Sequence, residues 1–213
     1  MLTKIKNNKN YIYVAIPFLL IICIITSKIL TNQELFIDQL AYNILVENLR
    51  TPTLTIIMKY VTKLSNTLFI IIFALVLSLL FYYKWNNKKI ALLIPTNLAT
   101  VAVINQVLKL IVQRERPNGY RIIEMSGYSF PSGHAMVSMA FYGLLIYIIY
   151  HLIKNKKVRT SLIIFNIIII ILIGISRIYL GVHYLSDIIT GYSISIIYLL
   201  ILTKLLKKYK FFP

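Results

Sequence analysis

Six long apolar runs, separated by short polar segments, dominate the pattern of the chain. They cover residues 11–30, 65–83, 90–112, 134–153, 160–180 and 185–206. Each run is apolar at successive positions for about 20 residues, the length that an α-helix needs to cross a bilayer. A membrane β-strand would instead alternate between apolar and polar residues over about 10 positions. The pattern therefore predicts an all-α, polytopic membrane protein with six transmembrane helices.

The segment 31–64, between the first two runs, has a different pattern. Its apolar residues fall on two neighbouring helical rows: Phe36, Leu40 and Ile44, and Ile37, Ala41 and Leu45. Together the two rows form one apolar face of a helix. The spacing predicts an amphipathic helix that lies in the membrane interface as a lid or wall rather than a seventh span.

Composition and charge agree with a membrane protein. Of the 213 residues 59% are hydrophobic, against about 45–50% in an ordinary soluble domain. The net charge of +17 would suggest nucleic acid for a soluble protein, but lysines beside membrane spans face anionic lipid. We therefore expect the bilayer, and no nucleic acid, as a partner. Because the sequence has no internal repeat, we interpret residues 1–213 as a single membrane-embedded domain. The first apolar run follows a basic segment without a cleavage site, so we interpret it as an uncleaved signal anchor.

The distribution of basic residues predicts the orientation. Fourteen Lys and Arg residues and no acidic residue fall in four segments: 1–10, 84–89, 154–159 and 204–213. Because basic segments stay on the cytoplasmic side, both termini should be cytoplasmic in a multi-pass protein of the cell membrane. The segment 31–64, the loop after residue 112 and the turn after residue 180 then face outward. The oligomeric state stays open.

The turn SRIYLGVHYLSD, residues 176–187, places three charged or titratable side chains between apolar runs. Such residues at a membrane edge are usually functional because their insertion is costly. Asp187 follows His183 at i+4, so one helical face can hold both. The carboxylate can then fix the imidazole tautomer and leave Nε2 free as a base or nucleophile. Arg177 lies across a short turn and can reach the same pocket.

The sequence PSGH, residues 131–134, predicts an anion site at the start of a helix. Pro131 suits a helix start, Ser132 is a favoured N-cap, and Gly133 allows a ligand close to the backbone. Free N–H groups and the helix dipole favour an anion there. His134 follows where a cation would be unfavourable, so we interpret it as an acid–base group.

A third cluster is cationic. Lys109 lies near the outer end of the third run, and Pro117, after Arg116, is predicted to stop that helix. Together with Arg114 and Arg121 these residues predict a phosphate-binding cluster, because a guanidinium can grip two oxygens at once.

Combined, the three clusters fit phosphoryl transfer through a phosphohistidine. Cations and N–H groups would stabilise the phosphate oxygens while one histidine attacks and the other protonates the leaving alkoxide. Two histidines and one carboxylate are too few ligands for a pair of metal ions, so no metal is expected.

The three motifs resemble a known family. K-x(6)-R-P, P-S-G-H and S-R-x(5)-H-x(3)-D occur in this order within residues 105–190. They are similar to the signatures of the type-2 phosphatidic acid phosphatase superfamily, whose members are integral membrane phosphatases. The six-span layout extends the resemblance to nearly the whole chain.

The resemblance implies roles for these residues and no metal or other cofactor. His183 would be the nucleophile, Asp187 its orienting partner, and His134 the general acid and then the base for water. The phosphate would be bound by a further set: Lys109, Arg116, Ser132, Gly133 and Arg177. The substrate would be a lipid phosphate monoester or pyrophosphate, with phosphatidylglycerophosphate, undecaprenyl pyrophosphate and phosphatidic acid as candidates. The link 118–130 would line the headgroup site, where Arg121, Glu124 and Tyr128 could discriminate.

Three alternatives use the same residues. A lipid transporter or flippase would hold its charges near mid-membrane rather than at span ends. A non-catalytic scaffold would be expected to have lost a histidine. Vanadium haloperoxidases share the motifs but are large soluble proteins, which disagrees with six spans in 213 residues.

Overall fold

The structure is a computed structural model and describes residues 8–212. Residues 1–7, which hold part of the basic N-terminal segment, lie outside the described residues, as does residue 213.

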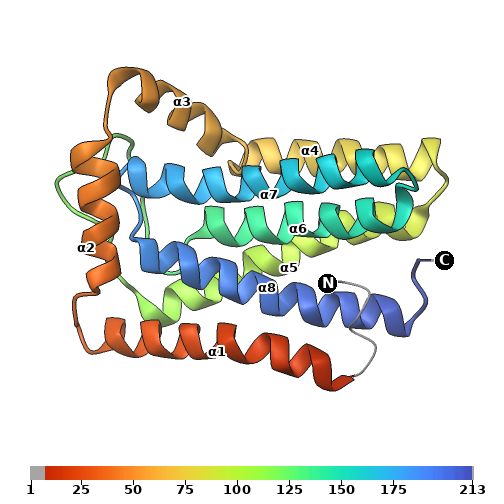
Figure 1. Ribbon diagram of the computed structural model, residues 1–213, viewed down its shortest axis with the longest axis horizontal. Helices are drawn as coiled ribbons and strands as arrows, with labels where there is room; N and C mark the ends of the chain where they lie inside the picture. The colour runs from red at the N-terminus through yellow and green to blue at the C-terminus, as the bar shows by residue number, and fades with distance from the viewer. Residues whose placement is uncertain (1–7, 213) are drawn as a thin grey trace.

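Within residues 8–212, six helices are long and apolar enough to cross a membrane, in the places that the sequence predicts. They are α1 (Asn8–Leu30), α4 (Thr67–Leu79) with the π-helical turn η3 (Leu80–Lys84), α5 (Lys88–Val112), α6 (Gly133–Leu152), α7 (Lys156–Tyr179) and α8 (Leu185–Lys208). The described residues contain no strand. The all-α prediction is confirmed. The start of α1 and the end of α8 both lie at the end of the bundle opposite the α7–α8 turn (Figure 1).

The centre of the bundle is α6, which packs against α5, α7 and α8. Its side chains Phe141 and Leu144 are fully buried together with Ile94 of α5 and Ile173 of α7. On the outside, α1 packs along α8 and α4 along α5, with large apolar side chains exposed as expected at a lipid-facing surface.

A glycine controls the distance between α6 and α8. A Cβ at Gly191 would lie 3.1 Å from both the Ala135 Cβ and the Ser132 carbonyl oxygen. That is closer than side chains normally approach, so glycine lets the second turn of α8 pack closely on the first turn of α6. As a result, the two predicted histidine-bearing helix starts lie side by side.

The helix α5 ends at Val112, where the predicted span 90–112 ends, but Pro117 is not the residue that stops it. Its last turn closes at Gln113, whose left-handed conformation (φ 51°) stops the helix four residues before Pro117. The prediction that Pro117 stops it is therefore wrong. Because the chain turns at Gln113, the following arginines point back over the end of the bundle rather than continuing along the α5 axis.

The segment 31–64 forms two helices instead of one. The first, α2 (Phe36–Tyr42), continues into the π-helical turn η2 (Asn43–Asn48) and lies across the end of the bundle (Figure 1). The second, α3 (Pro52–Lys63), packs on α7. Thr51 caps α3, with Pro52 in the first turn, a start signal that divides the segment.

The predicted amphipathy of α2 is confirmed. Ala41 is buried against the bundle, whereas Phe36 is 74% exposed on the opposite row. The apolar outer row suits an interface with lipid, and the inner row makes α2 a wall over the end of the bundle.

Candidate active site

The turn between α7 and α8 brings His183 to the end of the bundle. Gly181 in this turn has φ +73°, and a Cβ there would collide with the Tyr120 carbonyl. The neighbouring Leu180 carbonyl accepts a hydrogen bond from the Ile122 N–H at 3.0 Å. The close approach that glycine allows therefore joins this turn to the long loop 113–132.

His183 and Asp187 form the pair that their spacing predicts. His183 Nδ1 lies 3.2 Å from Asp187 Oδ2, and both side chains are buried. The helix begins only at Leu185, but Asp187 in its first turn also accepts the Tyr184 N–H at 3.0 Å. This bond caps α8 and fixes the carboxylate beside the imidazole. With Nδ1–H donated to the carboxylate, Nε2 carries the free lone pair.

A serine that the sequence analysis missed completes this pair. The Ser129 hydroxyl donates to Asp187 Oδ2 and lies 3.3 Å from His183 Nδ1. Its own N–H donates to the Arg114 carbonyl at 2.8 Å, which holds the loop in place. Ser129 lies three residues before Ser132, so its closeness to the PSGH motif was the available signal.

The Arg116 guanidinium lies beside the free nitrogen of His183. Its Nη1 is 3.1 Å from His183 Nε2 and donates to the Val182 carbonyl at 2.9 Å. Two further donors reach the Gly127 and Ser126 carbonyls. Backbone carbonyls therefore hold Arg116 without neutralising its charge.

Burial lowers the pKa of His183 to about 4, and the positive charges of Arg177 and Arg116 act in the same direction. The Asp187 carboxylate opposes them and raises the pKa, but it does not outweigh the burial. His183 is therefore neutral at physiological pH, the form that a nucleophile requires.

Arg177, at the end of α7, is 1% exposed and only partly paired. Its Nη1 donates to the Thr62 hydroxyl of α3 at 2.7 Å. Its Nε and Nη2 groups are buried and have no partner among the described residues. Buried charged donors normally have partners, so these two N–H groups favour an anionic ligand.

The start of α6 joins the same site. Ser132 is its N-cap, as predicted, and accepts the Ala135 N–H at 3.4 Å. The Ser132 N–H donates to the Asp187 carbonyl at 3.2 Å, which ties the two helix starts together. His134 lies next, with Arg177, His183, Arg116 and Lys109 as its titratable neighbours.

Lys109 completes the set. Its ammonium group lies near the end of α5 and donates to the Tyr128 carbonyl of the loop. The structure thus brings all eight predicted residues to one end of the bundle. Their side chains contact each other in the His183–Asp187 and His183–Arg116 pairs, and the Ser132 backbone contacts that of Asp187.

The other two arginines of the predicted cationic cluster do not belong to it. Arg114 forms ion pairs with Asp187 at 2.7 Å and with Asp38 of α2 at 2.9 Å. Arg121 turns back to the Pro117 carbonyl and the Asn118 side chain at the surface. The assignment of Arg114 to a phosphate cluster is therefore wrong, because two carboxylates already pair with its guanidinium, whereas Arg121 lies at the surface and bonds neighbouring loop oxygens.

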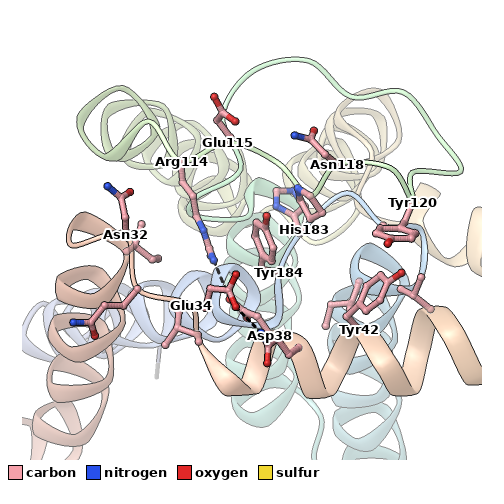
Figure 2. Close-up of a pocket in the computed structure, with 18 of the residues that line it drawn as sticks. Asn32, Glu34, Asp38, Tyr42, Arg114, Glu115, Asn118, Tyr120, His183 and Tyr184 are labelled. Atoms are coloured by element: carbon pink, nitrogen blue, oxygen red, sulfur yellow. Dashed lines mark hydrogen bonds and ion pairs between the residues drawn. The ribbon is translucent and has the colours of Figure 1, made fainter.

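A pocket of about 880 Å³ lies beside this site (Figure 2). Its walls are the end of α1, α2 with η2, the loop after α5 and the turn 181–184. His183 is one of its lining residues, whereas Lys109, Arg116, His134 and Arg177 are not. The pocket therefore reaches His183 but is not lined by these four groups.

Only part of the 118–130 link lines this pocket. Asn118 and Tyr120 do, and the Tyr120 ring lies 4.6 Å from the ring of Tyr42 of α2 (Figure 2). The three predicted discriminating residues, Arg121, Glu124 and Tyr128, are not among its lining residues.

These features define an integral membrane phosphatase, and comparison with known proteins agrees. The sequence profile of the PAP2 superfamily matches residues 90–211, which include all three motifs, and the chain belongs to this family. It is therefore a multi-pass membrane hydrolase that acts on phosphate esters of lipids. The resemblance inferred from the motifs is confirmed, and hydrolysis is favoured over the transporter and scaffold alternatives.

Two relatives are similar over most of their length. Phosphatidylglycerophosphatase B of Bacillus subtilis (strain 168) is 29% identical over 189 residues, 87% of this chain and 91% of the relative. The crystal structure of a transmembrane PAP2-type phosphatidylglycerolphosphate phosphatase from Bacillus subtilis superposes with a TM-score of 0.81. It is 27% identical, over 92% of this chain and 97% of that chain.

Proposed function

We propose that the protein hydrolyses the terminal phosphate of phosphatidylglycerophosphate through a phosphohistidine on His183, without a metal ion. The observation that carries the chemistry is the buried His183–Asp187 pair, in which His183 Nε2 lies beside Arg116. The two relatives, both named for this lipid, support the choice of substrate. Undecaprenyl pyrophosphate and phosphatidic acid are the other substrates to test.

In the first step, the Nε2 lone pair of His183 attacks phosphorus and the bond to the lipid oxygen breaks. His134 donates a proton to the leaving alkoxide, and Asp187 stabilises the positive imidazole that carries the phosphoryl group. In the second step, His134 takes a proton from water, the hydroxyl attacks phosphorus, and the N–P bond breaks. Inorganic phosphate leaves and His183 returns to its neutral form.

The phosphate oxygens would be held by charge and by backbone dipoles. The binding groups are the two unpaired N–H groups of Arg177, the ammonium of Lys109, the guanidinium of Arg116, and Ser132 with the Gly133 N–H at the start of α6. Such donors stabilise the charge that develops in the transition state. The basic segments at the opposite end support a site on the outer face, with both termini in the cytoplasm.

The test is phosphate release by the purified protein from each lipid in mixed micelles, with glucose 6-phosphate as a soluble comparison. We expect phosphatidylglycerophosphate to have the highest kcat/KM, activity to survive EDTA, and vanadate to inhibit. His183→Ala should be inactive. Equal turnover of glucose 6-phosphate would refute the lipid preference, and restoration by magnesium after chelation would refute the metal-free mechanism.

The intermediate is tested separately with substrate labelled in the terminal phosphate. Rapid quenching should trap label on the wild-type protein in an acid-labile, alkali-stable form, as expected for a phosphoramidate. Asp187→Asn should reduce the trapping rate, and His183→Ala should abolish it. Label retained in His183→Ala would assign the nucleophile to another residue.

A further inference from the structure

Asp38 lies far from the sequence motifs, but its carboxylate contacts the site. It is on the inner face of α2 and is buried, with 8% of its surface exposed. Figure 2 shows the Arg114 side chain reaching across the pocket wall toward it. A buried carboxylate on an interfacial helix requires strong partners, because its charge is costly away from water.

The first set of partners belongs to the start of α8. Asp38 Oδ1 accepts the Ser186 N–H at 2.7 Å, and Oδ2 accepts the Ser186 hydroxyl at 2.7 Å. Ser186 is in the first turn of α8, where backbone N–H groups have no partner within the helix. Asp38 therefore caps from another helix the same turn that Asp187 caps from within.

The second partner is Arg114, which links the two carboxylates. Its Nη2 donates to Asp38 Oδ2 at 2.9 Å and its Nη1 to Asp187 Oδ1 at 2.7 Å. The guanidinium also lies over the Tyr184 ring, 3.9 Å from its centroid. The result is a continuous row of contacts, Asp38–Arg114–Asp187–His183, from the wall of the bundle to the imidazole.

We propose that Asp38 is a positioning residue of the reaction, which holds Asp187 and thereby His183 in place through Arg114 and the Ser186 N–H. This role rests on the proposed function of His183 as the nucleophile. The hydrogen bonds of Asp38 go to Arg114 and Ser186, neither of which is among the proposed phosphate-binding groups. Its loss should therefore affect the rate of the chemical step more than substrate binding.

Two consequences distinguish this role from general support of the fold. Without the Asp38 charge, the positive charge of Arg114 is balanced by Asp187 alone, and the carboxylate is drawn from the imidazole toward the guanidinium. The uncompensated positive charge should also lower the pKa of His183. The other charged or titratable groups that face His183, which are Arg116, Arg177, Asp187 and His134, are unchanged in the variant.

The experiment compares Asp38→Asn with Glu34→Gln in the purified, full-length protein. Glu34 is the matched control, because it lines the same pocket but is exposed and bonds only Gln39. A displacement of about 1 Å in an active site can lower the rate about 100-fold. Asp38→Asn should shift His183 by less than that, so we expect kcat for phosphatidylglycerophosphate to fall roughly tenfold. KM should change less than about twofold, and the acid limb of kcat/KM should move to lower pH. Glu34→Gln should match the wild type in all three.

A double-mutant cycle tests the path. Because Asp38 acts partly through Arg114, Asp38→Asn should lower kcat less in the Arg114→Gln background than the roughly tenfold expected in the wild type, and fully additive defects would exclude the Arg114 route. Should Asp38→Asn fail to fold, Arg114→Lys replaces it, since the ammonium keeps the charge but loses the planar fork. The same fall in kcat at constant KM is expected.

Each outcome decides between the two proposals. A wild-type kcat in folded Asp38→Asn, with His183→Ala inactive, overturns the role of Asp38 alone. A raised KM with unchanged kcat overturns it as well. Activity that survives His183→Ala overturns the proposed nucleophile and the positioning role together.

Discussion

Replacing Arg177 by methionine should inactivate the enzyme without destabilising the ligand-free protein. Arg177 is 1% exposed, and two of its N–H groups have no partner among the described residues. Methionine fills a similar volume without a charge. Replacement of buried ionic groups by apolar residues of similar size is often neutral or stabilising by about 1–4 kcal/mol.

The magnitude of the functional loss follows from the same two N–H groups. Hydrogen bonds to charged groups contribute about 1.5–3 kcal/mol each, so two bonds to phosphate contribute roughly 3 kcal/mol or more. At about 1.4 kcal/mol per tenfold change, kcat/KM should fall at least about 100-fold. A buried donor without a partner lowers the stability of the ligand-free protein by about 1–3 kcal/mol. Arg177→Met removes these donors, so its stability should not fall although its activity does.

The assay is thermal unfolding in detergent, with and without orthovanadate, beside phosphate release. Vanadate should raise the Tm of the wild type and have no effect on Arg177→Met. Arg50→Met is the matched control: the Arg50 Nε and Nη2 groups donate to the Tyr179 carbonyl at 3.0 and 2.7 Å, so its loss should lower the Tm and keep the vanadate response. A Tm for Arg177→Met as low as that of Arg50→Met, or a retained vanadate shift, would refute the reasoning.

Three further predictions concern the turn and the histidine pair. Ser129→Ala removes a hydrogen-bond donor to Asp187, so kcat should fall about tenfold at constant KM, which is near the lower end for a hydrogen bond to a charged group. Phosphate release measures kcat, and an unchanged kcat would contradict the prediction. Gly181→Ala should lower the Tm, because φ is +73° and the Cβ would meet the Tyr120 carbonyl; an unchanged Tm would contradict that reading. The pKa of His183 is lowered to about 4, below its usual value of 6.5, so the unfolded chain binds a proton more readily between these values. Stability from this group should be full above pH 6.5 and be lost as the pH falls toward about 4, which unfolding in urea at each pH measures against His183→Gln.

The spans could be predicted from the sequence because continuous apolar runs leave few alternatives in a membrane. The division of 31–64 was missed, although Thr51-Pro52 is a common helix start. The end of α5 had no comparable signal, since Gln113 adopts a left-handed conformation that glycine or asparagine would normally indicate. Local chemistry therefore predicted the elements better than their ends.

In the candidate site, the motif residues could be predicted from the sequence, whereas the residues that position them could not. The motif residues could be found because histidines and cations at span ends are costly and thus informative. The residues that hold them could not, because they lie far away in the chain: 148 positions separate Asp38 from Ser186, and 115 separate Thr62 from Arg177. Aspartate and threonine on an amphipathic helix look like ordinary polar residues until the fold places them against the site.

The distribution of charges over this end of the bundle supports the proposal that it binds a phosphate. Arg114 is the cation that pairs with the carboxylates, and its single positive charge is shared between Asp38 and Asp187. Lys109 and Arg116 are held by neutral backbone carbonyls, and Arg177 by a hydroxyl, so their charges remain available. Had a carboxylate paired with any of these three, a phosphate would compete with an ion pair already formed in a site of low dielectric. In the proposed function, this separation lets Asp38, Arg114 and Asp187 order His183 while the unpaired cations remain positive enough to attract the phosphate.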